Sequence, residues 1–163
     1  MRNLFLLSAL TAAFVACGGE PAASPAEGGG AALSASIDLP PVLVHKTATC
    51  GCCNGWIDHL REAGFDVEAR DTRTLHTLKA DVGVPAQLAS CHTAIIDGYV
   101  VEGHVPAYVI RQLLEERPEV TGISVPGMPI GSPGMEGPNP QPYSVYAFDR
   151  GGRAEVFAEV DPR

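Results

Sequence analysis

Residues 41–64 of the chain are PVLVHKTATCGCCNGWIDHLREAG. The first part, Pro41 to Lys46, is an apolar and β-branched run of the kind that forms a buried strand. Three cysteines follow a short turn. After them, apolar residues recur at helical spacing with charged residues between them, and Gly64 is a typical stop; the apolar set is Trp56, Ile57, Leu60 and Ala63. We therefore predict a strand, a cysteine-rich loop and a helix in direct succession.

The pattern continues downstream with further short elements. Residues 65–69 alternate like a strand, residues 75–82 have helical spacing, and residues 93–96 and 99–101 flank the turn dipeptide Asp97-Gly98. Pro106 is placed to open a third helix. The resulting β-α-β-α-β-β-α order is that of the thioredoxin-like α/β fold. Two alternating runs, 143–148 and 154–160, predict an appended C-terminal β-hairpin, so we expect one domain over residues 39–163.

The first part of the chain has the layout of an export signal. Arg2 precedes an apolar run from Leu4 to Val15, and Phe14-Val15-Ala16-Cys17 resembles a lipobox. We predict a signal peptide at residues 1–16, then a lipidated N-terminus and flexible tether at residues 17–38, rich in Gly, Ala, Pro and Ser. The expected product is periplasmic and held at the inner or outer membrane by lipid on Cys17. The alternative is ordinary signal cleavage, which gives a soluble periplasmic protein.

The charge balance excludes one class of partner. The chain carries 11 Lys and Arg against 19 Asp and Glu, and its formal net charge is -8. Nucleic acids are bound largely through clustered basic residues. We therefore expect no nucleic acid partner.

Four cysteines remain after Cys17, at positions 50, 52, 53 and 91. Two structural disulfides are one alternative in an oxidising compartment, but three of the four lie within four residues, which favours a metal site or a redox site. Placement at a helix start lowers thiol pKa values. Cys50 and Cys53 are three apart and can face one point, whereas the helical spacing turns Cys52 away from it.

The second half of the predicted site is Cys91-His92, directly before the third strand. Thioredoxin-like redox enzymes keep a cis-proline there, so a Cys-His pair instead favours a soft metal, Cu(I) or Zn(II). His104 is a further candidate ligand or else a strand or helix cap. Met128 and Met135 are thioether candidates or else apolar plugs, in a Pro/Gly-rich loop that we expect to fold over the cysteines. We expect His45 at a strand end, and His59 and His76 to be solvated.

Four long strings in the chain resemble a known family. They are KTATCGCC (46–53), VPAQLASCHT (84–93), DGYVVEGHVP (97–106) and VPGMPIGSPGME (125–136). Together they are similar to a bacterial family of unknown function that is associated with metal binding and copper resistance. The resemblance spans roughly residues 41–160, and it implies a periplasmic metal-handling role linked to copper.

These observations converge on a non-catalytic protein that binds or delivers copper. Cys50, Cys53 and Cys91 are expected to hold Cu(I), with His92 or a methionine completing the shell. Cys52 is either a further ligand or a spare thiol, and a copper-handling protein is the expected partner. The principal alternative is a thiol-disulfide oxidoreductase in which Cys50 attacks and Cys53 resolves. A third is a lipoprotein whose cysteines form only structural disulfides.

Overall fold

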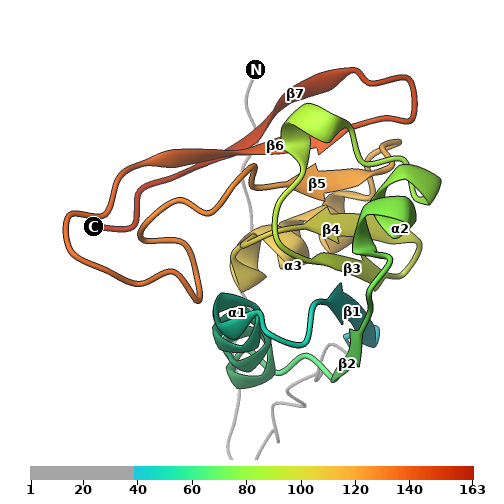
Figure 1. Cartoon of the computed structure of the whole chain (residues 1–163). Helices are drawn as coiled ribbons and strands as arrows, with labels where there is room; N and C mark the ends of the chain where they lie inside the picture. The colour runs from blue at the N-terminus through green and yellow to red at the C-terminus, as the bar shows by residue number, and fades with distance from the viewer. Residues whose placement is uncertain (1–38) are drawn as a thin grey trace, which may run out of the picture. The chain divides into compact units, whose positions relative to one another are not determined.

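The computed structural model describes residues 39–163 (Figure 1). The predicted signal peptide, residues 1–16, and the lipidated tether, residues 17–38, lie outside the described residues, so both stay predictions. In the described part, none of the helices has the length and apolar character needed to cross a bilayer.

Three α-helices, a short 3-10 turn and seven strands make up the described part. In chain order they are β1 (Val42–Lys46), α1 (Gly51–Glu62), β2 (Val67–Asp71), α2 (Leu75–Asp81), η1 (Ala86–Leu88), β3 (Thr93–Ile96), β4 (Tyr99–Glu102), α3 (Ala107–Glu116), β5 (Gly122–Ser124), β6 (Tyr143–Phe148) and β7 (Ala154–Val160). The predicted order up to α3 and the C-terminal hairpin are confirmed. Strand β5 was not predicted, because three residues are too few to show a period of two.

All seven strands form one mixed sheet in the order β2-β1-β3-β4-β5-β6-β7. The β1/β2 and β4/β5 pairs are parallel and the other neighbours are antiparallel. Asp97 and Gly98, which connect β3 to β4, both have positive φ (47° and 86°), as a tight hairpin turn requires. The C-terminal hairpin is thus more than an appendage, since β5 joins β6 and β7 to the main sheet.

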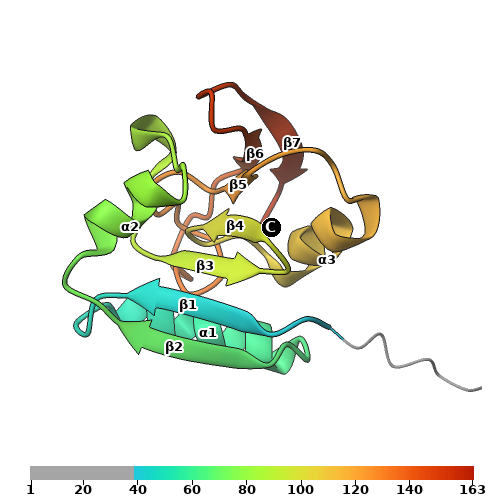
Figure 2. The ribbon, with the colours of Figure 1, turned by 90° about the vertical axis from the view of Figure 1, so that its right-hand side faces the viewer.

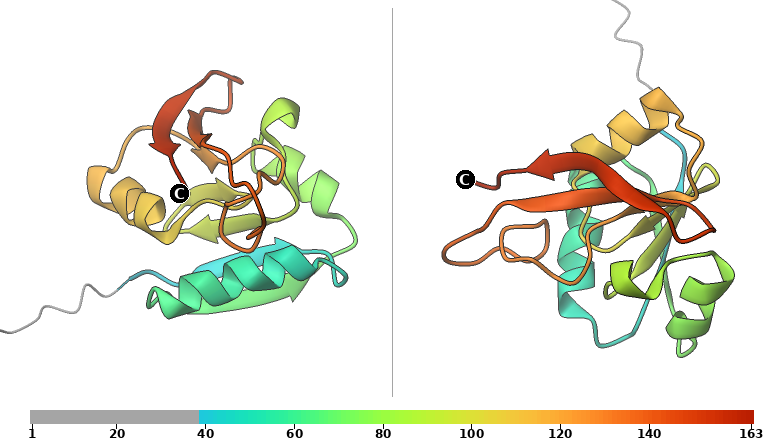
Figure 3. Two further views of the ribbon diagram at one scale, coloured as in Figure 1. Left: turned by 90° about the vertical axis from the view of Figure 1, so that its left-hand side faces the viewer. Right: turned by 90° about the horizontal axis from the view of Figure 1, so that it is seen from above.

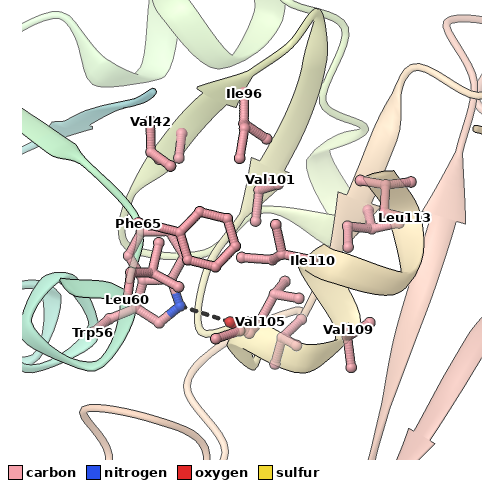
Figure 4. Close-up of a cluster of buried hydrophobic side chains, with 14 of the residues drawn as sticks. Val42, Trp56, Leu60, Phe65, Ile96, Val101, Val105, Val109, Ile110 and Leu113 are labelled. Carbon is pink, nitrogen blue, oxygen red and sulfur yellow. Dashed lines mark hydrogen bonds between the residues drawn. The ribbon is translucent and has the colours of Figure 1, made fainter. Parts of the chain in front are cut away.

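The central strands β3 and β4 are covered on both faces. In Figures 1 and 2, α1 runs along β1 and β2, and α2 and α3 lie on opposite sides of β3 and β4. The main core lies under α1 and α3 and includes Trp56, Leu60 and Ile110, each 2% exposed or less (Figure 4). A smaller cluster lies on the α2 side: Val84, Leu88, Val100 and Phe148. The burial of both strand faces explains the continuous apolar runs in β3 and β4.

Strand directions bring distant segments to one edge of the sheet. The end of β1 lies beside the start of β3, where His45 pairs with Thr93. Thr93 in turn pairs with Glu102, at the end of β4, and Glu102 pairs with Ser124, at the end of β5. The cysteine loop, the Cys91 segment, the residues after β4 and the long loop 125–142 therefore all start from this edge, and that loop comes back beside α1 (Figure 3).

Candidate metal centre

The first half of the site is the start of α1. Cys50 is the N-cap residue of α1, and its side chain makes no capping hydrogen bond. Cys53, one turn later, is fully buried. Their Cα atoms are 5.4 Å apart and their sulfur atoms are joined in a disulfide. The prediction that these two cysteines face one point is confirmed. In this structure, however, they are bonded to each other and are not free thiols.

Cys52 does not turn away from the cluster as its helical spacing predicts. Its Sγ lies 3.5 Å from Cys50 Sγ, 3.9 Å from Cys91 Sγ and 4.0 Å from the Sδ of Met128. The prediction was wrong because it treated position 52 as part of a regular helix face. Position 52 is in the first turn of α1, and two of its three neighbours, Cys91 and Met128, come from other segments. Cys52 is a free thiol and half-buried.

Cys91 joins the two halves of the site. Its Sγ lies 3.5 Å from Cys53 Sγ, and Cys53 Sγ also lies 3.8 Å from the backbone carbonyl of Cys91. Two imidazoles approach the same sulfur, His92 through Nδ1 at 3.3 Å and His104 through Nε2 at 3.0 Å. Burial, together with the neighbouring Cys52, raises the pKa of the Cys91 thiol to about 12. Without a cation, Cys91 is therefore held as the neutral thiol.

His104 is oriented by the long loop. Its Nδ1 lies 2.8 Å from the carbonyl oxygen of Pro133, which can only accept a hydrogen bond, so the proton sits on Nδ1 and the lone pair of Nε2 faces Cys91. Burial holds the pKa of His104 below its usual value, which keeps the ring neutral. A carbonyl that fixes the tautomer in this way is the usual support of a metal-binding histidine.

His92 is buried between aromatic rings. It lies 4.3 Å from the ring of Trp56 and 5.0 Å from that of His104, measured between centroids. Burial, then His104 and Lys79, keep the pKa of His92 well below its usual value. Its Nε2 has no hydrogen-bond partner among residues 39–163. Because only Nδ1 faces the sulfur cluster, His92 has one donor atom to offer there.

The long loop 125–142 covers the cluster, as predicted from its apolar content. A Cβ atom on Gly134 would lie 2.5 Å from the carbonyl oxygen of Cys52 and 2.6 Å from the amide nitrogen of Trp56, so the loop backbone packs directly on α1. The loop also brings Met128 to the site with its side chain half exposed. Met135 instead closes a turn through its backbone, to Gly131 and Ser132, and within the described range it makes no polar contact with the cluster.

The remaining histidines do not join the cluster. His45 is half-buried in β1 and His76 is exposed on α2. His59 is not simply solvated, as its spacing predicts, because its Nε2 accepts a hydrogen bond of 3.0 Å from the amide of Ala107 at the start of α3. No local pattern signals this contact, which joins two helices far apart in the sequence.

The donor atoms lie close to the spacing that a shared ion requires. Two sulfurs bound to one ion through bonds of about 2.3 Å lie no more than about 4.6 Å apart. The donor atoms of Cys50, Cys52, Cys53 and Cys91 all lie within 4.8 Å of one another, and so do those of Cys91, His92 and His104. Cys91 belongs to both groups. Reduction of the disulfide would therefore place four thiols around one point, with the preoriented imidazole of His104 beside one of them, Cys91.

Comparisons with known proteins found a family model and solved structures that this chain resembles. The family described as "Protein of unknown function, DUF411" matches residues 88–135, which include Cys91, His104 and Met128. Two solved structures, named copper resistance protein CopG form 2 and form 1, are each 45% identical to the chain, with TM-scores of 0.72 and 0.71. Each alignment covers 76% of this chain, and they cover 100% and 98% of the two structures. No curated protein matches the chain.

Proposed function

The chain belongs to the same family as copper resistance protein CopG, and from this membership and the geometry of its sulfur cluster we propose that it binds copper as Cu(I). The ligands are the thiolates of Cys50, Cys52, Cys53 and Cys91 in the reduced protein. His104 Nε2 and the thioether of Met128 complete the donor set. The observation that carries the proposal is Cys91 Sγ, which lies 3.5 Å from one cysteine sulfur and 3.0 Å from an oriented imidazole nitrogen.

The choice of Cu(I) rests on the softness of the donors. Thiolates and thioethers select Cu(I), whereas zinc sites use thiolate and imidazole without thioether. Met128 Sδ lies 4.0 Å from Cys52 Sγ, on the exposed side of the cluster. Zinc is therefore the second metal to test. The thioether also gives an incoming or departing Cu(I) a ligand that solvent and a copper-handling partner can reach.

The disulfide between Cys50 and Cys53 supports a second candidate, a thiol-disulfide oxidoreductase. A dithiol at a helix N-terminus is a common arrangement for such chemistry. Against it, Cys91 lies 3.5 Å from Cys53 Sγ as a third thiol, which a redox site built on two cysteines does not need. We propose that the disulfide-bonded protein is the oxidised form of the metal site, in which Cys50 and Cys53 cannot act as thiolate ligands.

A Cu(I) competition titration on fully reduced protein tests the function. Cys91→Ser is expected to weaken binding by orders of magnitude, because it removes the sulfur shared by both halves of the site. Met128→Leu is expected to weaken binding modestly, whereas Met135→Leu is the matched control from the same loop and leaves the affinity unchanged. Protein oxidised at Cys50 and Cys53 is expected to bind Cu(I) much more weakly.

An insulin reduction assay on the same proteins decides between the candidates. The copper proposal fails if wild-type protein binds Cu(I) no more tightly than a simple dithiol peptide. If that protein also reduces insulin with turnover, and Cys91→Ser retains this activity, the oxidoreductase replaces it. Strong Cu(I) binding without turnover supports the metal-binding function.

We also propose a thioredoxin-like unit and an export route. The order β2-β1-β3-β4, with β1 and β2 parallel and the rest antiparallel, supports a thioredoxin-like unit to which β5, β6 and β7 add three strands. The lipobox-like segment at Cys17 supports a periplasmic protein anchored by lipid. Labelling with a radioactive fatty acid tests the anchor, and incorporation that survives Cys17→Ser would overturn it.

A further inference from the structure

A buried polar network lies directly behind the Cys91 segment, on the α2 side of the sheet. Its centre is Glu102, the last residue of β4, whose side chain is fully buried. Glu102 Oε1 lies 2.5 Å from Lys79 Nζ of α2, and Oε2 accepts a hydrogen bond of 2.7 Å from the Thr93 hydroxyl. Lys79 Nζ also donates to Thr93 Oγ1 at 2.9 Å. All three polar side chains are thus satisfied inside the protein.

The same carboxylate reaches the metal site through the backbone. Glu102 Oε1 accepts a hydrogen bond of 2.6 Å from the amide of Ser90, the residue before Cys91. An amide bound to a buried carboxylate is among the stronger hydrogen bonds in proteins. On the other side of Cys91, the carbonyl of His92 accepts from the amide of Gly103 at 3.1 Å. The irregular segment that carries Cys91 is therefore held at both flanks.

Ser90 also links the Cys91 segment to the long loop. Its hydroxyl donates to the carbonyl of Gly127, and the amide of Gly127 donates to the carbonyl of Ala89 at 3.3 Å. Met128 is the next residue. Gly103 leaves room for this contact, because a Cβ there would lie 2.5 Å from Ser90 Oγ. One carboxylate thus supports both Cys91 and Met128.

Stability alone does not explain a charge pair at this place. Replacing a buried ion pair with apolar residues of similar volume is often neutral or stabilising, because burial removes both charges from water. The network is therefore expected to have a role beyond holding β4 against α2. Lys79 and Thr93 also bind each other, whereas the Ser90 amide has Glu102 as its hydrogen-bond partner.

We propose that Glu102, neutralised by Lys79, is a positioning residue of the metal centre that holds Cys91 and Met128 in place through Ser90. The proposal rests on Cu(I) binding as the proposed function. Glu102 does not contact the ion in this mechanism. Its carboxylate determines where the Ser90 amide lies, and thereby where the Cys91 sulfur meets those of Cys52 and Cys53.

Two double variants separate positioning from charge. Lys79→Met with Glu102→Gln removes both charges but retains a carbonyl oxygen for the Ser90 amide. Lys79→Met with Glu102→Met removes both charges and the acceptor. Val100→Ala is the stability control, since Val100 lies on the same strand as Glu102 and belongs to the apolar cluster on the α2 side.

Reduced proteins are compared by Cu(I) competition titration. The Gln variant and Val100→Ala are expected to bind within threefold of wild type, and the Met variant about tenfold more weakly, which is about 1.4 kcal/mol. In a Cys91→Ser background, the Gln and Met variants are expected to differ by less than twofold. Equal affinities of the two double variants, or the same difference between them without Cys91, would overturn the proposal.

A readout without copper keeps the test independent of the proposed function. The rate at which Cys91 is alkylated in the metal-free reduced protein, resolved by mass spectrometry, is expected to rise at least threefold in the Met variant and not in the Gln variant. If wild-type protein fails to bind Cu(I) but this difference is found, the proposed function is wrong and the positioning role stands. If the two rates are equal, the positioning role is wrong.

Discussion

Gly134→Ala tests whether the long loop is held on α1 by direct backbone packing. Gly134 has a φ of 81°, and an added Cβ would lie 2.5 Å from Cys52 O and 2.6 Å from Trp56 N. Both are backbone atoms of the helix that carries the cysteines, so neither moves aside cheaply. Gly127 in the same loop also has positive φ, 68°, but a Cβ there meets nothing within 4 Å.

The two glycines share one cost and differ in another. A residue with a Cβ in the left-handed region costs roughly 1–2 kcal/mol, and both variants bear it. Forcing a methyl group into a packed contact costs a further 1–3 kcal/mol, roughly, and only Gly134→Ala bears that. The loop can relieve the clash by leaving α1. The equilibrium constant for docking the loop on α1 is therefore expected to fall roughly fivefold to 150-fold further in Gly134→Ala than in Gly127→Ala.

Native-state proteolysis measures this difference. Cleavage after Glu136 by a glutamate-specific protease requires the loop to extend, so its rate follows the undocked population. Gly134→Ala is expected to be cut roughly fivefold to 150-fold faster than Gly127→Ala, while urea unfolding shows that both variants remain folded. Equal cleavage rates would refute the packing of the loop on α1, and with it the delivery of Met128 and Pro133 to the site.

Two further predictions concern the packing of α3 and the core. His59→Ala removes the acceptor for the Ala107 amide and is expected to cost about 1 kcal/mol at pH 8. Burial lowers the pKa of His59 in the folded state, against smaller opposing effects of Glu136 and Glu62. The stabilisation that the neutral His59 ring gives is therefore complete above pH 6.5, its ordinary pKa. It is lost as the pH falls through the lowered pKa of His59 in the folded state. Urea unfolding at pH 8 and pH 5 checks this, and an equal cost at both would contradict it. Trp56→Phe leaves the buried carbonyl of Val105 without the indole donor that lies 2.8 Å away, and is expected to cost about 1–3 kcal/mol in the same assay; a loss below 0.5 kcal/mol, roughly, would contradict it.

Local pattern alone was enough to predict most of the fold. The short apolar runs of β1 and β3 and the helical spacing after Cys53 follow from residue type and side-chain direction, which neighbouring residues in the chain determine. The turn at Asp97-Gly98 likewise follows from which residues tolerate positive φ. The short strand β5 left no such signal. Its place depends on hydrogen bonds with β4, a pairing that exists only once the chain has folded.

The site divides in the same way. The sequence by itself identified the candidate donors, because several thiols at a helix start and a Cys-His pair before a strand are chemically conspicuous. Only the tertiary structure placed Cys52 inside the cluster, set the His104 tautomer through Pro133, separated Met128 from Met135, and revealed Glu102 behind Cys91. Residue type and local spacing are properties of a short segment. Distances between segments depend on how the strands at one edge of the sheet are paired, and no short segment contains that information.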